Sequence, residues 1–280
     1  MKVAIYLLTL LHFTTALPSQ RSSRSDIKGI NLYVDPVSNY TVDEAVDGRI
    51  IGGDEIAPHT RAYQVALIIN GQNFCSGSLI SQNYVLTAAH CTATASYVEL
   101  IFGAHNVNSY ESTQLRVTSN SIISHPDYKN PYPLSNDIAL IKTPTPIVTN
   151  GYINKTLLAS SDSGPYEGYT PALSGWGTTS DSGTGISTGL RHVWVGVLKN
   201  TECAGIYGHT YDLTYNMCTS GAGPAGACNG DSGSPLVVGP HQIGLVSFIS
   251  SRGCEYGDPT GYVRIGYYRP WIDQYTGGDL

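Results

Sequence analysis

The sequence predicts an all-β protein, and two observations carry that prediction. The first is composition: 31 glycines, 15 prolines and 20 tyrosines among 280 residues favour turns and strands over long helices. The second is that short segments rich in β-forming residues recur from residue 50 onwards, many of them bounded by Gly, Pro, Asn or Ser. This pattern is typical of an antiparallel barrel or sandwich.

The expected strands are residues 63–69, 78–87, 97–102, 115–124, 138–142, 192–198, 235–238 and 242–249. Only residues 267–275 have helical spacing, because Tyr267, Trp271 and Ile272 fall on one face. We therefore expect a single helix near the C-terminus. The length allows one large β domain or two small ones.

The charge composition narrows the range of partners. Hydrophobic residues make up 41% of the chain and charged residues 13%, so the chain can bury a core. The formal net charge is −6, and no dense basic run occurs. Because phosphate contacts need clustered Lys and Arg, we expect no nucleic-acid partner.

The first residues have the layout of a secretory signal peptide. Lys2 precedes an apolar stretch over residues 3–11, and Thr14, Thr15 and Ala16 offer small residues for cleavage. The apolar stretch is well below the ~20 residues that span a bilayer. We expect a signal peptide at residues 1–16 and a secreted, extracellular protein with no membrane partner.

Residues 17–49 differ in amino-acid composition from the rest of the chain. They are polar, lack cysteine, carry Arg21 and Arg24, and end in an acidic stretch over residues 43–48. These features indicate a flexible propeptide rather than a domain. Glycosylation sequons begin at Asn39 and, in the body of the chain, at Asn154.

The cysteine count agrees with export. An even number of cysteines in an exported chain indicates three disulfides, although spacing alone leaves several pairings open. Zinc is the competing interpretation, but no CxxC pair occurs and the histidines do not cluster near the cysteines. The six are Cys75, Cys91, Cys203, Cys218, Cys228 and Cys254.

Three short segments hold the residue types that acyl transfer requires. His90 lies among small residues beside a cysteine, Asp137 opens an apolar strand, and Ser232 lies between glycines in a tight turn. A serine nucleophile needs a base, an acid that orients the base, and backbone N–H donors for the oxyanion. Each segment alone has an ordinary structural explanation. Together, in one exported β-rich chain, they indicate a catalytic triad.

These segments resemble the chymotrypsin-type serine endopeptidases. The matching motifs are IIGG at 50–53, TAAHC at 87–91, DIAL at 137–140, SGWG at 174–177 and GDSGSP at 230–235. The resemblance implies two six-stranded antiparallel β-barrels over residues 50–280, with the active site between them and a C-terminal helix. It implies that His90 is the general base, Asp137 orients it and Ser232 is the nucleophile.

By the same resemblance, the N–H groups of Gly230 and Ser232 form the oxyanion hole. The implied disulfides are Cys75–Cys91, Cys203–Cys218 and Cys228–Cys254, which use every cysteine and leave none for an accessory domain. The sequence departs from the family at Ser234, where glycine is usual, and at Ala104, where calcium-binding relatives carry a glutamate. We expect no metal and no cofactor.

The resemblance also implies activation by proteolysis. A trypsin-like protease would cut after Arg49, and the new α-amine of Ile50 would pair with Asp231. Pairing with a buried carboxylate would raise the pKa of that amine above its ordinary 7.7–8.0 or so. The expected product is a monomeric digestive protease with protein or peptide substrates and protein inhibitors. The rival hypothesis is a non-catalytic homologue that keeps the fold.

Alignment to the family places the floor of the primary specificity pocket at Gly226. Without a carboxylate there, a substrate Arg or Lys would be buried unpaired at a cost of several kcal/mol. The walls would come from Ser247, Phe248 and Ile249 and from Thr260. Because Ile249 and Thr260 are branched where glycines open the chymotrypsin pocket, we expect elastase-like specificity for small or medium apolar residues. The alternative is that a longer loop around Arg252 moves Ile249 aside and admits aromatic residues.

Overall fold

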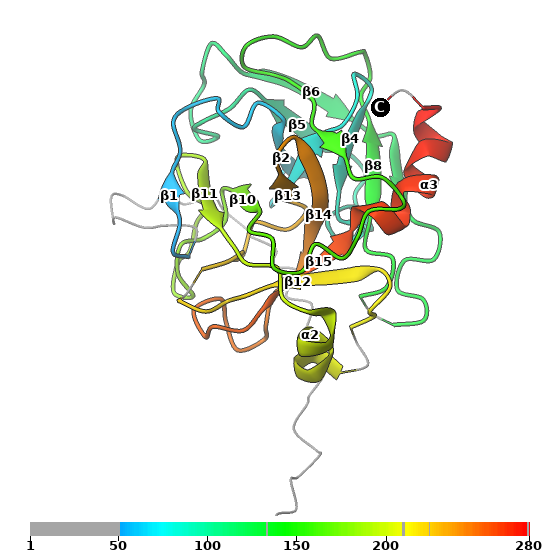
Figure 1. Ribbon diagram of the computed structural model, residues 1–280. Coiled ribbons are helices and arrows are strands. Elements are labelled where there is room, and N and C mark those ends of the chain that lie inside the picture. The colour runs from blue at the N-terminus through cyan, green and yellow to red at the C-terminus, as the bar shows by residue number, and fades with distance from the viewer. Residues whose placement is uncertain (1–50, 133, 209–210, 224, 279) are drawn as a thin grey trace, which may run out of the picture.

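The computed structural model describes residues 51–280 apart from residues 133, 209, 210, 224 and 279. Two antiparallel sheets dominate this part of the chain, and each curls around its own core (Figure 1). Three helices accompany them: α1 (Ala89–Thr92), α2 (Asn200–Tyr207) and α3 (Ile265–Thr276). The prediction of an all-β fold with a C-terminal helix is confirmed.

The first sheet has the strand order β6-β5-β2-β3-β4-β8-β7. Its members are β2 (Gln64–Ile69), β3 (Asn73–Leu79), β4 (Tyr84–Thr87), β5 (Val98–Phe102), β6 (Leu115–Ser119), β7 (Ile122–Ser124) and β8 (Ala139–Lys142). The two edge strands, β6 and β7, are separated only by Asn120 and Ser121. They are two halves of one bent strand, so the sheet curls back on itself. Val65, Leu67, Leu86, Leu100 and Leu140 fill its interior.

The second sheet has the order β1-β11-β10-β13-β14-β15-β12, with β9 added in parallel beside β14. Its members are β1 (Asp54–Glu55), β9 (Leu157–Leu158), β10 (Ala172–Gly175), β11 (Arg191–Trp194), β12 (Asn216–Thr219), β13 (Pro235–Val238), β14 (His241–Phe248) and β15 (Thr260–Arg264). Beyond β11 the chain continues to Val197, which bridges Thr219 of β12. This bridge brings the two ends of the sheet together.

The strand count differs from six per barrel for a simple reason. In the first sheet the bend divides one strand into β6 and β7. In the second sheet two short segments of two residues are added, β1 beside β11 and β9 beside β14. Each sheet has six strands when β6 and β7 are counted as one strand and β1 and β9 are left out.

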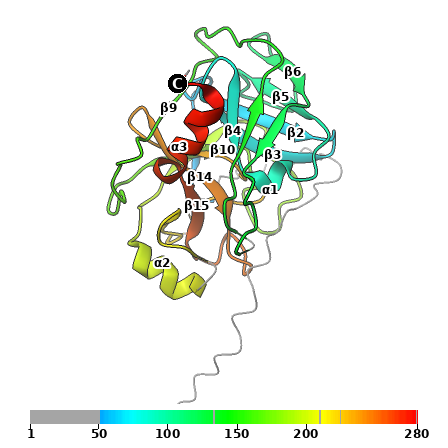
Figure 2. The same cartoon turned by 90° about the vertical axis from the view of Figure 1, so that its right-hand side faces the viewer.

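Buried hydrogen bonds and one helix join the two sheets. The Gln64 amide donates to the Ser174 carbonyl oxygen (3.1 Å) and the Ser174 hydroxyl donates back to Gln64 Oε1 (2.9 Å). Ser78 Oγ donates to Gln242 Oε1 (2.6 Å). Helix α3 follows β15 of the second sheet but packs Ile265 and Ile272 into the core of the first (Figure 2).

Several expected elements differ from the structure. Residues 78–87 are not one strand, because the chain turns between β3 and β4, where Ser81 N donates to the Tyr84 carbonyl. The strands that were not predicted are β1, β9, β10, β12, β15 and most of β3, and the helices that were not predicted are α1 and α2. Helix α2 buries only Cys203 and Tyr207, so it has no apolar stripe with helical spacing.

No helix among the described residues has the length and apolar character needed to cross a membrane. The predicted signal peptide, the propeptide and the sequon at Asn39 lie outside the described residues. Asn154 is exposed on the surface.

Candidate active site

His90 and Asp137 meet in the first sheet. His90 belongs to the short helix α1, which follows β4, and Asp137 precedes β8, which pairs with β4. The Asp137 carboxylate accepts a hydrogen bond from the His90 ring at Nδ1 (2.7 Å) and another from the His90 backbone N–H (2.8 Å). Both residues are buried. The contact assigns the proton to Nδ1 and leaves Nε2 as the ring's acceptor.

Ser247 reaches the same carboxylate from the second sheet. Its hydroxyl donates to Asp137 Oδ2 (2.6 Å). In the pairing of β14 with β15, Val246 faces Tyr262 and Phe248 faces Gly261, so Ser247 is the extra residue of a β-bulge. A bulge redirects one side chain out of the strand alternation. Here it turns a serine of the second sheet toward the acid of the first.

Ser232 lies in a turn before β13 whose backbone N–H groups are unevenly used. Those of Asp231, Gly233 and Ser234 donate to backbone carbonyls. By contrast, the N–H groups of Gly230 and Ser232 have no acceptor among the described residues. Gly230 has a φ of 93°, a conformation that favours glycine. The turn thus presents two unpaired donors beside the serine.

Asp231 is fully buried within the same turn. Its carboxylate accepts hydrogen bonds from the backbone N–H groups of Gly177 (2.8 Å) and Cys228 (3.0 Å). Burial raises the pKa of Asp231 to about 7. A Cβ atom at Gly175 or Gly177 would lie within 2.5 Å of this carboxylate. The motif at 174–177 therefore needs its glycines to make room for Asp231.

The three disulfides are Cys75–Cys91, Cys203–Cys218 and Cys228–Cys254, the pairing that the resemblance implies. The first ties β3 to helix α1 next to His90. The third joins the turn of Ser232 to the loop after β14. The second joins helix α2 to β12.

Gly226 and Thr260 adjoin each other at the expected pocket floor. A Cβ atom at Gly226 would lie 2.8 Å from Thr260 Oγ1, and that hydroxyl oxygen accepts a hydrogen bond from Ala227 N (3.3 Å). Thr260 is buried. Phe248 packs edge-to-face on Tyr207, whose hydroxyl donates to the Pro259 carbonyl.

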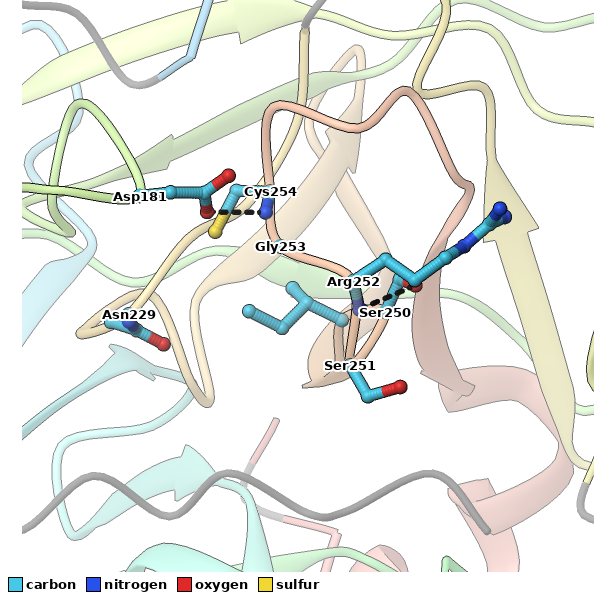
Figure 3. A pocket seen from close by; sticks show the side chains of 8 residues that line it. Asp181, Asn229, Ser250, Ser251, Arg252, Gly253 and Cys254 are labelled. Atoms are coloured by element: carbon cyan, nitrogen blue, oxygen red, sulfur yellow. Dashed lines mark hydrogen bonds between the residues drawn. The ribbon is translucent and has the colours of Figure 1, made fainter. Parts of the chain in front are cut away.

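Ile249 is half-buried and borders a cavity of about 470 Å³, whose other lining residues are labelled in Figure 3. The other walls are Asn229, Asp181 and residues 250–254 of the following loop. Asp181 was missed by sequence reasoning: its carboxylate accepts hydrogen bonds from the N–H groups of Cys254 (2.6 Å) and Glu255 (3.2 Å). No motif surrounds Asp181, so only the fold could reveal this contact.

Two groups in the described part of the chain have metal-ligand types close together: Cys75, His90 and Cys91, and Asp181, Cys228 and Cys254. In both, the cysteines are in disulfides and offer no thiolate. Ala104 lies in the loop between β5 and β6, where calcium-binding relatives carry a glutamate. In this chain the Glu111 carboxylate of that loop accepts hydrogen bonds from the backbone N–H groups of His105 (2.7 Å) and Asn106 (3.2 Å).

The structure thus brings most predicted site residues to the junction of the two sheets. Ser76 N donates to the carbonyl of Ser232 (2.8 Å), which places the serine's turn against β3. No described hydrogen bond joins Ser232 Oγ to His90, and such catalytic bonds are often long before substrate binds. Arg49 and Ile50 lie outside the described residues.

This arrangement brings together an imidazole acceptor, a carboxylate that orients it, a partly buried serine in a turn, and two N–H donors without an acceptor among the described residues. These groups together suit acyl transfer. The trypsin family profile matches residues 50–272. Brachyurin of Leptuca pugilator is 41% identical over 81% of this chain and 99% of its own length. Chymotrypsin of Phaedon cochleariae is 33% identical over 99% of this chain and 98% of its own length.

Solved structures agree with these relatives. A structure titled as HL collagenase superposes with a TM-score of 0.73 at 33% identity, covering 81% of this chain and 98% of its own. A structure titled GrC has a TM-score of 0.75 at 29% identity, with 81% and 99% coverage. The chain therefore belongs to the trypsin family and is a serine endopeptidase of the chymotrypsin type.

Proposed function

We propose that Ser232 attacks the scissile carbonyl, that His90 Nε2 takes its proton and that Asp137 holds the imidazole in the required tautomer. The N–H groups of Gly230 and Ser232 would bind the oxyanion. His90 would then return the proton to the leaving amine, and water would hydrolyse the acyl-enzyme. The observation that carries this assignment is the pair of unbonded N–H groups in a turn whose other N–H groups are bonded.

Active-site labelling tests these roles. After activation, a serine-reactive fluorophosphonate should label the protein, and Ser232→Ala should abolish the label. A folded, activated protein that stays unlabelled would support the non-catalytic homologue instead.

Activation by cleavage after Arg49 is the second part of the proposal. Asp231 is buried with no cation bonded to it among the described residues, and an inserted α-ammonium would supply that charge. Ile51 is already buried, and its carbonyl accepts a hydrogen bond from Gly226 N (3.1 Å). Ile51, the second residue after the proposed cleavage point, thus lies against the segment that leads to Asp231.

N-terminal sequencing of the active form should begin at Ile50. A precursor carrying Arg49→Gln should resist a trypsin-like protease and remain inactive. Activity of that variant after the same treatment would overturn the proposed cleavage point.

Secretion and processing complete the proposal: a signal peptide at residues 1–16, a propeptide at 17–49 and a monomeric digestive enzyme. The alignment with the Phaedon chymotrypsin spans 99% of this chain, so the similarity includes residues before Ile50. Three disulfides suit an oxidising compartment. Because Asn154 is exposed, its sequon is accessible for glycosylation. The occupants of the site would be protein substrates and protein inhibitors.

We further propose specificity for small or medium apolar residues before the scissile bond. Thr260 Oγ1 lies over Gly226 and would shorten the pocket, and Ile249 would narrow its entrance. One observation favours the alternative of aromatic specificity: the cavity of about 470 Å³ beside Ile249 provides room for that side chain to move.

Peptides that differ only in the residue before the scissile bond separate the two candidates. The enzyme should prefer Ala, Val or Leu. Changing both Ile249 and Thr260 to glycine should raise kcat/KM on Phe peptides by roughly 10- to 100-fold, since pocket volume discriminates by that order. A native enzyme that already prefers Phe or Tyr would refute the elastase-like assignment.

A further inference from the structure

The loop that follows β14 is held together by its own side chains. Asp258 accepts hydrogen bonds from the Ser250 hydroxyl and from the Arg252 guanidinium, at Nε (2.8 Å) and at Nη2. The same guanidinium lies over the Tyr256 ring, 3.8 Å from its centroid. Residues 250–258 therefore form one unit, which we call the pocket loop because it borders the cavity of about 470 Å³.

Asp181 joins the pocket loop to another part of the chain. It belongs to the segment between β10 and β11, and its carboxylate faces the backbone of Cys254 (Figure 3). Oδ1 accepts a hydrogen bond from Cys254 N (2.6 Å), and Oδ2 accepts one from Glu255 N (3.2 Å). In return, Asp181 N donates to the Glu255 carboxylate (2.9 Å). A Cβ atom at Gly253 would lie 2.3 Å from Asp181 Oδ2, so the loop backbone packs directly against this side chain.

The segment that carries Asp181 is itself bonded to the turn of the proposed nucleophile. Thr178 N donates to the Asn229 carbonyl (2.7 Å), and the Thr178 hydroxyl donates to Cys228 Sγ (3.1 Å). The Cys228–Cys254 disulfide links the same turn to the pocket loop. The loop thus has a covalent link to this turn and a second link through Asp181. A loop can pivot about a single link, whereas a second link made of directional hydrogen bonds restricts that rotation.

Ile249 depends on the pocket loop for its position. It follows Phe248, the last residue of β14, and it makes no backbone hydrogen bond among the described residues. Its side chain borders the cavity that residues 250–254 also line. When the pocket loop moves, the main chain at Ile249 has to move with it, and the cavity offers the space. The width of the pocket is therefore coupled to the contacts of Asp181.

We propose that Asp181 is a positioning residue that determines specificity. Through the N–H groups of Cys254 and Glu255 it holds the pocket loop where Ile249 narrows the pocket and disfavours aromatic residues. The inference rests on the proposed function for the roles of Ser232 and Ile249. It adds that the narrow pocket depends on a carboxylate from a different loop, and not on Ile249 alone.

The test compares two peptides that differ only in having Val or Phe before the scissile bond. In the activated enzyme, Asp181→Ala should raise the ratio of kcat/KM for Phe to that for Val by about 3- to 10-fold, the order of hydrogen bonds to an exposed charged group. Asp181→Asn keeps one acceptor oxygen and should restore most of the native ratio. A merely structural role would lower kcat/KM for both peptides alike, and an unchanged ratio would overturn the proposal.

Asp162→Ala is the matched control. Asp162 is also an exposed aspartate bonded within a loop, to the Ser160 side chain, and it does not line the cavity. This variant should keep the native ratio. A change as large as that in Asp181→Ala would show that the ratio responds to loss of any surface carboxylate, and would refute the assignment to Asp181.

Two readouts separate this proposal from the proposed function. A native enzyme that prefers Phe would refute the elastase-like assignment, but a further rise of the ratio in Asp181→Ala would still support the role of Asp181. Hydrogen exchange requires no catalysis. In the full chain carrying Ser232→Ala, adding Asp181→Ala should speed amide exchange at Cys254 and Glu255 by about threefold or more, measured by mass spectrometry. Unchanged exchange would overturn the proposal even in a catalytically inert protein.

Discussion

Two buried carboxylates support the candidate site, and they are satisfied in different ways. Asp137 accepts hydrogen bonds from the His90 ring, the His90 backbone N–H and the Ser247 hydroxyl. Asp231 accepts hydrogen bonds from two backbone N–H groups, and burial raises its pKa to about 7. Asp137 is thus beside an ionisable base, whereas Asp231 has no bonded base in the described part of the chain.

Asp137 and Asp231 are therefore stabilised by different parts of the molecule. The fold itself brings His90 and Asp137 together. Helix α1 follows β4, Asp137 precedes β8, and β4 and β8 are neighbouring strands of one sheet. The turn proposed to bind the oxyanion contains Asp231, whose negative charge is unfavourable while no cation is bonded to it. Changes at the two carboxylates should therefore have effects of different kinds.

The largest expected effect is that of Asp137→Asn. The amide can donate to His90 Nδ1 and so stabilise the wrong tautomer, with Nε2 protonated. In the family's template triad this change lowers kcat on the order of 10⁴-fold, and we expect a similar loss in steady-state assays of the activated enzyme. Asp273→Asn, at a half-exposed aspartate on α3, is the control and should leave kcat unchanged. A loss of less than tenfold at Asp137 would contradict its orienting role.

The Asp231 carboxylate should make stability depend on pH in the uncleaved chain. Its pKa is raised from 3.8 to about 7 on folding, so the folded state holds the proton more tightly than the unfolded state. Stability should therefore fall as pH rises from about 4 to about 7, by a few kcal/mol at most. After cleavage at Arg49, pairing with the α-ammonium should lower that pKa and shrink the loss.

Denaturant unfolding at several pH values measures this effect, with both forms in the Ser232→Ala background to prevent self-digestion. Asp231→Asn in the uncleaved chain should flatten the profile over the same window. If the cleaved and uncleaved forms show the same profile, Asp231 does not respond to the new amine.

The smallest effects should come from two serines near the two carboxylates. Ser247 Oγ donates to Asp137. The Ser234 hydroxyl is fully buried, lies with Asp231 beside Gly175, and has no hydrogen-bond partner among the described residues. Ser247→Ala should lower kcat/KM by about 10-fold or more, the order of one hydrogen bond to a charged group.

Ser234→Ala should change the free energy of unfolding by less than about 1 kcal/mol, since it removes an unpaired hydroxyl. A large loss for Ser234→Ala would show that its hydroxyl is bonded in solution.

The sequence predicted the all-β class, the closing helix and the strand cores because alternating apolar residues and turn residues are local signals. It missed β10, β12 and β15, whose four or five residues are buried throughout and so lack alternation. It also missed α2, which buries only two side chains.

Of the candidate site, the sequence indicated His90, Asp137 and Ser232 through their motifs. The third hydrogen bond to Asp137 could not be foreseen, because it depends on the bulge that turns Ser247 out of β14. The contact of Asp181 with the backbone of Cys254 is equally invisible, since it joins residues 73 positions apart without a motif. Contacts of this kind follow only from tertiary packing.

The hydrogen bonds that join the two sheets have a consequence for catalytic accuracy. Apolar surfaces slide over each other at little cost, whereas the Gln64–Ser174 and Ser78–Gln242 bonds are directional and buried, and a shift of either sheet would break them. His90 belongs to one sheet and Ser232 to the turn before a strand of the other. The spacing between the proposed base and the proposed nucleophile is therefore held by amide and hydroxyl groups that have no proposed part in the reaction.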